Sequence, residues 1–184
     1  MLSGLIDAIL PKSAGIYVDD VKINSHRTGL LLGSNLGDKK FNLKKAIELI
    51  GNSAGKVLKT SSIYKTAAWG KLDQPHFYNL AIVLATYLSP KQLLEEILKI
   101  ESLMGRVRKE KWGPRIIDVD ILFFDDKVEN SQNLKIPHPE LHKRKFALIP
   151  LSEIEPEWFH PFLKKNIETL IRECKDTLNV TVLK

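Results

Sequence analysis

The segment from Phe77 to Tyr87 constrains the fold more than any other part of the sequence, because its side chains alternate as in a β-strand. One face would carry the larger side chains Tyr78, Leu80, Ile82 and Leu84. The other face would carry Phe77 and Asn79, followed by the small Ala81. We therefore expect a sheet that contains this strand and that buries its apolar face against helices.

Strand and helix patterns alternate around this segment. Asp38 is a good N-cap, and Ser89 followed by Pro90 is a favoured way to begin a helix. Helices are expected at about 38–50, 89–105 and 166–173, and further strands at 29–33, 57–64 and 116–125. The order strand, helix, strand, strand, helix, strand predicts an α+β fold, a ferredoxin-like sandwich in which helices pack on an antiparallel sheet.

The length and composition fit one domain. The 184 residues are 43% hydrophobic, and no apolar run approaches the roughly 20 residues that cross a bilayer. Cys174 is the only cysteine, so an intramolecular disulfide is excluded and a reducing compartment is favoured. We expect a cytoplasmic monomer that binds no membrane.

Residues 1–27 are expected to form an N-terminal extension of unknown role before a single domain at 28–184. The apolar residues of the extension would form one face of a short helix before Pro11: Leu2, Leu5, Ile6, Ile9 and Leu10. A docking helix and a loosely ordered extension are both compatible with this pattern.

Two acidic residues, Asp118 and Asp120, lie two apart on an expected strand, so both carboxylates point the same way with Cβ atoms about 6–7 Å apart. The opposite face would be apolar, with Ile117, Val119, Ile121 and Phe123. Two carboxylates this close repel each other and favour a cation between them, and Mg²⁺ prefers such ligands together with substrate phosphates. The alternative is a solvated pair that nearby arginines neutralise.

The chain has a formal charge of +6 and two basic clusters, one just before the acidic pair and one at Lys143-Arg144-Lys145. Arg106, Arg108 and Arg115 precede the acidic pair, and their guanidinium groups suit phosphate oxygens; a solvated loop is the alternative. Trp112 would offer a flat surface for a ring or plug the loop. Glu101 would lie on the apolar face of its helix, either paired with an arginine or in contact with a ligand.

Phe77 and Asn79 would share one strand face. An aromatic ring can stack on a flat heterocycle, and an amide can read the edge of a pterin or purine. Thr66, Trp69 and Phe146 would complete such a site if the fold brought them together. The alternative is that Phe77 and Asn79 simply fill the sheet.

Several motifs resemble those of the 6-hydroxymethyl-7,8-dihydropterin pyrophosphokinase family. The longest is Arg106-Val-Arg108 followed by Trp112-Gly-Pro-Arg-Ile-Ile-Asp-Val-Asp-Ile121. The others follow in the family's order: Gly33-Ser-Asn35, Tyr64-Lys-Thr66, Asp73-Gln-Pro75, Phe77-Tyr-Asn79, Ile100-Glu-Ser102, Pro137-His138, Arg144 and Phe146. The resemblance covers about residues 28–171 and implies the same ferredoxin-like fold.

The resemblance also implies a reaction, in which the pterin hydroxymethyl oxygen attacks the β-phosphorus of ATP and AMP is released. Asp118 and Asp120 would hold two Mg²⁺ ions, and Arg106 and Arg115 would be catalytic with them. ATP would contact Glu101, Arg108, Trp112, Arg115, Ile121, His138 and Arg144. The reduced pterin would contact Gly33, Thr66, Ala67, Trp69, Phe77, Asn79, Trp112 and Phe146.

The sequence departs from the family at a few positions. Ala67 stands where proline is frequent, and Leu98 and Asn133 replace polar or basic residues near the nucleotide. Two other classes of protein share part of this pattern. An RNA-binding module shares the element order, but Asp118 and Asp120 would repel nucleic acid, so no nucleic-acid partner is expected. A metal-dependent phosphohydrolase would need the acidic pair but not the ring-binding residues.

Overall fold

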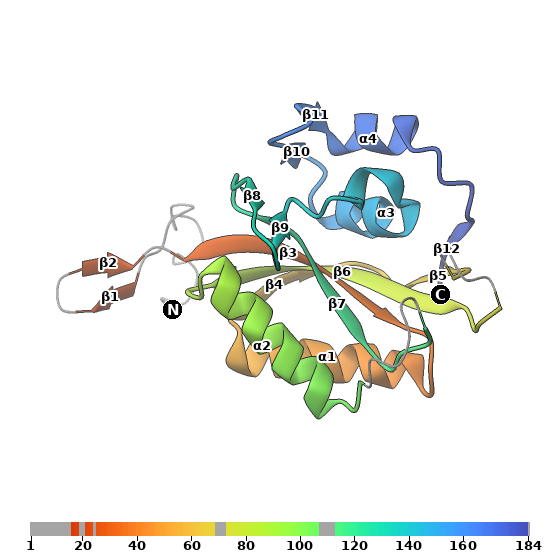
Figure 1. Cartoon of the computed structure of the whole chain (residues 1–184), viewed down its shortest axis with the longest axis horizontal. Coiled ribbons are helices and arrows are strands. Elements are labelled where there is room, and N and C mark those ends of the chain that lie inside the picture. The colour runs from red at the N-terminus through yellow and green to blue at the C-terminus, as the bar shows by residue number, and fades with distance from the viewer. Residues whose placement is uncertain (1–15, 19–20, 24, 69–72, 107–112, 184) are drawn as a thin grey trace, which may run out of the picture.

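The computed structural model describes residues 16–18, 21–23, 25–68, 73–106 and 113–183, and an antiparallel sheet lies at its centre (Figure 1). The strands of this sheet are β3 (His26–Ser34), β4 (Lys56–Thr60), β5 (Tyr64–Thr66), β6 (Phe77–Thr86), β7 (Asp118–Phe124) and β12 (Val180–Val182). Their order is β12-β5-β6-β3-β7, and β4 also pairs with β6. β3 is the first strand of the expected pattern, and it lies between β6, the third, and β7, the last. This order confirms the ferredoxin-like arrangement.

Helices cover both faces of this sheet. Figure 1 shows α1 (Lys39–Ser53) and α2 (Pro90–Leu103) on one side and α3 (Lys145–Ile154) and α4 (Ile167–Glu173) on the other. The expected caps are present: the Asp38 side chain accepts from the backbone N–H of Phe41, and Ser89 forms a capping box with Gln92. The last helix begins after Asn166, as predicted.

The face toward α1 and α2 is a continuous hydrophobic core. Side chains that alternate along β3 and β6 supply its centre, as the pattern of Phe77–Tyr87 predicted. Its largest fully buried members include Leu30, Leu32, Leu43, Ile50, Ile82, Leu84, Leu93 and Ile97. This face holds the sheet to α1 and α2, and Glu101 of the expected site is buried.

A β-bulge in β7 changes which residues face α3. Pairing with β3 shifts between Gly29 and Leu30, so that Leu122 is the extra residue and Phe123 lies opposite Gly29. Phe123 therefore packs with the α3 and α4 side, where its ring stacks on Trp158. The expectation that Phe123 shares a face with Ile121 was wrong, because the period of two breaks at the bulge.

The single strand expected at 57–64 is two strands. Ser61 interrupts them: its backbone N–H donates to the Ala81 carbonyl, and its hydroxyl accepts from the Ala81 N–H. Short pairs complete the fold: β1 (Ile16–Val18) with β2 (Val21–Ile23), β8 (Glu129–Asn130) with β9 (Lys135–Ile136), and β10 (Phe159–His160) with β11 (Lys165–Asn166).

The expected boundary at residue 28 falls inside β3, which begins at His26. The helix expected before Pro11 lies outside the described residues. Across the part of the chain that the structure describes, no helix is long and apolar enough to span a bilayer.

Candidate active site

The polar residues of the site lie in register across three strands. Gly33 in β3 is opposite Asn79 in β6 and also opposite Asp118 in β7. Directly paired residues share a face of the sheet, so the amide and the carboxylate lie on either side of a glycine, on the face toward α3. Two residues along β3 and on the same face, Leu31 is opposite Asp120. The register thus brings together residues that are far apart in the sequence.

Asn79 is held in a defined orientation. It is buried, and its Nδ2 donates to Thr66 Oγ1 at 2.8 Å. A Cβ at Gly33 would lie 2.8 Å from Asn79 Oδ1, which is too close, so a larger residue at this position would displace the amide. Phe77 is half-buried two residues before Asn79, and Ala67 is half-buried after Thr66. The structure therefore groups five of the residues expected at the pterin.

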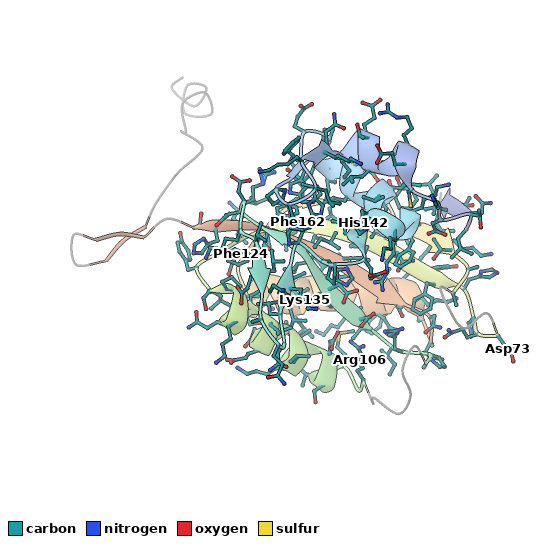
Figure 2. The ribbon with its side chains drawn as sticks, turned by 45° about the horizontal axis from the view of Figure 1, so that its top comes forward. Asp73, Arg106, Phe124, Lys135, His142 and Phe162 are labelled. Atoms are coloured by element: carbon teal, nitrogen blue, oxygen red, sulfur yellow. The ribbon has the colours of Figure 1, made fainter. Side chains whose placement is uncertain are left out.

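Two arginines bind Asp118. Arg106 Nη1 lies 2.6 Å from one carboxylate oxygen, and Arg115 Nη1 donates to the other at 2.8 Å. Arg106 lies where the chain leaves α2, as Figure 2 shows, and Arg115 lies just before β7. Two guanidinium groups therefore converge on one carboxylate at the edge of the Asn79–Gly33–Asp118 row.

Glu101, in α2, binds both Arg106 and the backbone of β7. Its side chain is buried, it accepts a hydrogen bond from Arg106 Nη1, and it accepts another from the Val119 backbone N–H at 2.8 Å. A buried acid needs such partners, because desolvation of an unpaired carboxylate is costly. Of the two alternatives that the sequence left open, the structure contains the arginine pair.

Asp120 has a weaker partner. Arg144 Nη1 lies 4.0 Å from its Oδ2. Burial, and next the negative charge of Asp118, raise the pKa of Asp120 to about 7. Two oxygen ligands whose repulsion a cation would relieve fit Mg²⁺, which typically takes one or two carboxylates and completes its shell with water and phosphate. Among the described residues no group of three or more His, Cys, Asp or Glu side chains is placed to hold a metal.

Arg144, Phe146 and His138 lie on the α3 side of the site. The Arg144 guanidinium lies 5.8 Å from the centre of the Phe146 ring. Burial, and next the Arg144 charge, lower the pKa of His138 to about 4, so this imidazole is neutral near pH 7. Its Nδ1 accepts from the Glu140 backbone N–H, which leaves Nε2 as the donor.

Asn35 is a site residue that the sequence analysis did not single out. Its buried side chain donates to Gln74 Oε1 at 3.0 Å and accepts from the Arg115 backbone N–H at 2.7 Å. It thus joins the chain before β6 to the chain before β7. The signal was present in the Gly33-Ser-Asn35 motif, but the motif alone does not indicate what the amide binds.

Among the described residues, Ile121 is an expected site residue whose side chain does not face this group. The Ile121 side chain lies in the core on the α1 and α2 face, so the structure turns it away from Asp120. Trp69, Arg108 and Trp112 lie outside the described residues.

Comparison with known proteins assigns the family. The family model described as 7,8-dihydro-6-hydroxymethylpterin-pyrophosphokinase (HPPK) matches residues 29–156. A protein of Aquifex aeolicus named 2-amino-4-hydroxy-6-hydroxymethyldihydropteridine pyrophosphokinase is 43% identical over 137 residues, covering 74% of this chain and 85% of that protein. A Synechocystis protein of the same name is 42% identical over 165 residues, covering 89% of this chain and 84% of that protein.

The solved structures agree at the level of fold. The crystal structure of wild-type Plasmodium falciparum HPPK-DHPS matches with a TM-score of 0.66 and 21% identity, over 81% of this chain. This chain spans 41% of that longer one, and at this identity the likeness shows the fold alone. The family model spans more than half of the chain and the sequence relatives are over 40% identical, so the chain belongs to the 7,8-dihydro-6-hydroxymethylpterin-pyrophosphokinase family.

Proposed function

We propose that this chain transfers the diphosphate of ATP to the hydroxymethyl group of 6-hydroxymethyl-7,8-dihydropterin and releases AMP, a step of folate biosynthesis. The observation that carries the proposal is the Asn79–Gly33–Asp118 row, which sets a buried amide near an arginine-bound carboxylate. The family membership and the names of the sequence relatives support the same reaction.

The chemistry is a substitution at phosphorus. The hydroxymethyl oxygen bonds to the β-phosphorus of ATP, and the bond from that phosphorus to the bridging oxygen of the α-phosphate breaks. AMP leaves with that oxygen, and the hydroxyl proton is lost. We assign no side chain as a general base. The residues position the two substrates in line and neutralise charge, which supplies most of the rate enhancement in such reactions.

Arg106 and Arg115 are the proposed phosphate clamps. Both now bind Asp118, which keeps two guanidinium groups oriented beside the carboxylate. Asp118 and Asp120 would hold Mg²⁺, and we propose two ions, which when bound neutralise the phosphate oxygens. Arg144 and the Nε2–H of His138 would donate to the phosphates from the α3 side. Arg108 is proposed to assist them, and Glu101 to line the nucleotide side.

The reduced pterin is proposed to bind beside Asn79. The amide would donate to and accept from the edge of the ring, and Thr66 would hold the amide in place. Phe146 would stack on one side of the ring and Trp69 on the other. Gly33, Ala67, Phe77 and Trp112 complete the proposed contacts. We further propose that the enzyme is a cytoplasmic monomer.

A product analysis tests the reaction. The protein is mixed with Mg²⁺ and ATP, with and without 6-hydroxymethyl-7,8-dihydropterin, and the nucleotides are separated. The proposal expects AMP only with pterin, one AMP for each pterin diphosphate. ADP or phosphate formed without pterin would contradict it and favour a phosphohydrolase. RNA binding with steep salt dependence and no turnover would favour the RNA-binding alternative.

A further inference from the structure

The Glu153 carboxylate, in α3, is occupied by hydrogen bonds from the chain around β5. The Ser62 backbone N–H donates to both carboxylate oxygens at 3.0 Å, and the Ser62 hydroxyl donates to Oε1 at 2.9 Å. The Tyr64 hydroxyl donates to Oε2 at 2.8 Å. Burial, and next the bond to Glu153, raise the pKa of Tyr64 to about 12, so this hydroxyl keeps its proton. The proposed reaction uses none of these groups.

On the sheet side, this contact is continuous with the pterin site. Tyr64 and Thr66 are two apart in β5, so their side chains share a face. Tyr64 is opposite Asn79, and Thr66 is opposite Phe77. Because Thr66 Oγ1 accepts from Asn79, a displacement of β5 would move the hydrogen-bond partner that orients the amide.

On the helix side, Glu153 lies on the same face of α3 as Phe146. Glu153 follows Phe146 by seven residues, which is two helical turns, so both lie on one face of α3, about 10 Å apart along its axis. Lys59 in β4 donates to the Ile154 carbonyl, and Tyr64 then meets Glu153. Arg144, just before α3, lies 4.0 Å from Asp120, and Glu155, just after α3, binds Arg27, so the helix runs from the Leu31 end of β3 toward its Arg27 end. Because β5 pairs with the Asn79 end of β6, Thr66 lies toward the end of α3 that carries Phe146.

We propose that Glu153 is a positioning residue for pterin binding: it fixes β5, and with it Thr66 and Asn79, relative to the first turn of α3, without touching either substrate. This inference rests on the proposed function. The competing view is that Glu153 only stabilises the fold. Glu155 offers the matched comparison, because it directly follows α3 and binds Arg27 in β3 and Lys59 in β4 but no residue of β5.

Binding measurements separate the two views. Pterin affinity is measured by calorimetry with Mg²⁺ and α,β-methylene ATP, whose carbon bridge prevents transfer, and affinity for this analogue is measured alone. Glu153→Ala should weaken pterin binding about tenfold and Tyr64→Phe about threefold, with analogue affinity within twofold of wild type. Tyr64→Phe should add nothing to Glu153→Ala, because the two share one contact. Glu155→Gln should lower the melting temperature without weakening pterin binding.

Two results would overturn the inference. One is pterin affinity within twofold of wild type in both the Glu153 and the Tyr64 variants. The other is equal weakening of pterin and analogue, or equal weakening by Glu155→Gln, because either marks a general loosening. If Glu153→Ala does not fold, the pterin affinity of Tyr64→Phe decides between the two views, because this substitution removes only one oxygen atom. If the wild-type protein forms no AMP with pterin, the proposed function is wrong. If the wild type turns over normally and the variants keep their pterin affinity, only the inference about Glu153 is wrong.

Discussion

The two faces of the sheet use the same strands in different ways. Toward α1 and α2, strands β3, β6 and β7 present mainly apolar side chains, and these are buried. Toward α3, successive rows change from apolar to polar along β3: Val83–Gly29–Phe123, then Ala81–Leu31–Asp120, then Asn79–Gly33–Asp118. The first face therefore stabilises the fold, and the second combines a core with a site. Substitutions on the two faces should separate stability from chemistry.

The largest effect is expected at the polar end of the second face. Asp118→Asn should lower the rate of AMP formation at least about 10³-fold, because it removes a proposed Mg²⁺ ligand and the partner of two arginines. Steady-state assays would measure the loss, and circular dichroism would show that the variant is folded. The matched control is Asp126→Asn, at an exposed turn residue, which should retain activity. Survival of activity in Asp118→Asn would make the metal assignment wrong.

The apolar face should respond in the opposite way. Leu84 is fully buried between the sheet and the α1 side. Leu84→Ala should lower the free energy of unfolding by about 2–5 kcal/mol, measured in urea, because it leaves a cavity. The activity of the protein that remains folded should be close to that of wild type. If Leu84→Ala lost activity without losing stability, the two faces would not differ in role as described.

The lowered pKa of His138 predicts that the stability of the protein depends on pH. Its folded pKa of about 4 lies below its ordinary value of 6.5, so below pH 6.5 the unfolded chain binds a proton that the folded chain does not. Wild type should therefore lose about 1–2 kcal/mol relative to His138→Gln between pH 7.5 and pH 5. Urea unfolding of both proteins at the two pH values measures this. Parallel pH profiles would show that His138 is not held neutral.

The smallest effect is expected from a single methyl group. Gly33→Ala would bring a Cβ within 2.8 Å of Asn79 Oδ1 and displace the amide. Pterin affinity, measured by calorimetry, should fall about tenfold, equivalent to about one hydrogen bond, while affinity for an ATP analogue is unchanged. Gly51→Ala, in α1 and near only Val57 at 4.0 Å, is the control and should leave pterin binding intact. Equal pterin affinities in the two variants would count against the Asn79 assignment.

Much of the fold could be predicted because it depends on local signals. The alternation of Phe77–Tyr87 and the caps at Asp38 and Ser89 are properties of short segments, and the structure confirms them. The bulge at Leu122 could not be predicted, because it depends on how β7 pairs with β3. The break at Ser61 likewise depends on its two hydrogen bonds to Ala81, which is distant in the sequence.

The candidate site was predictable in its residue types but not in its contacts. The spacing of Asp118 and Asp120 placed both on one face, and the structure agrees. Which arginine pairs with Glu101 depends on how α2 packs beside β7, so the sequence left it open. The clamp of Glu153 on Tyr64 was invisible for the same reason, since it joins residues 89 positions apart.

One measurement tests the central claim most directly, namely that the polar end of the second face binds both substrates. It is a crystal structure with Mg²⁺, α,β-methylene ATP and the pterin. We predict metal on Asp118 and Asp120, Arg106 and Arg115 on phosphate oxygens, and the pterin edge on Asn79. Substrates bound elsewhere, with both arginines still on Asp118, would contradict the account.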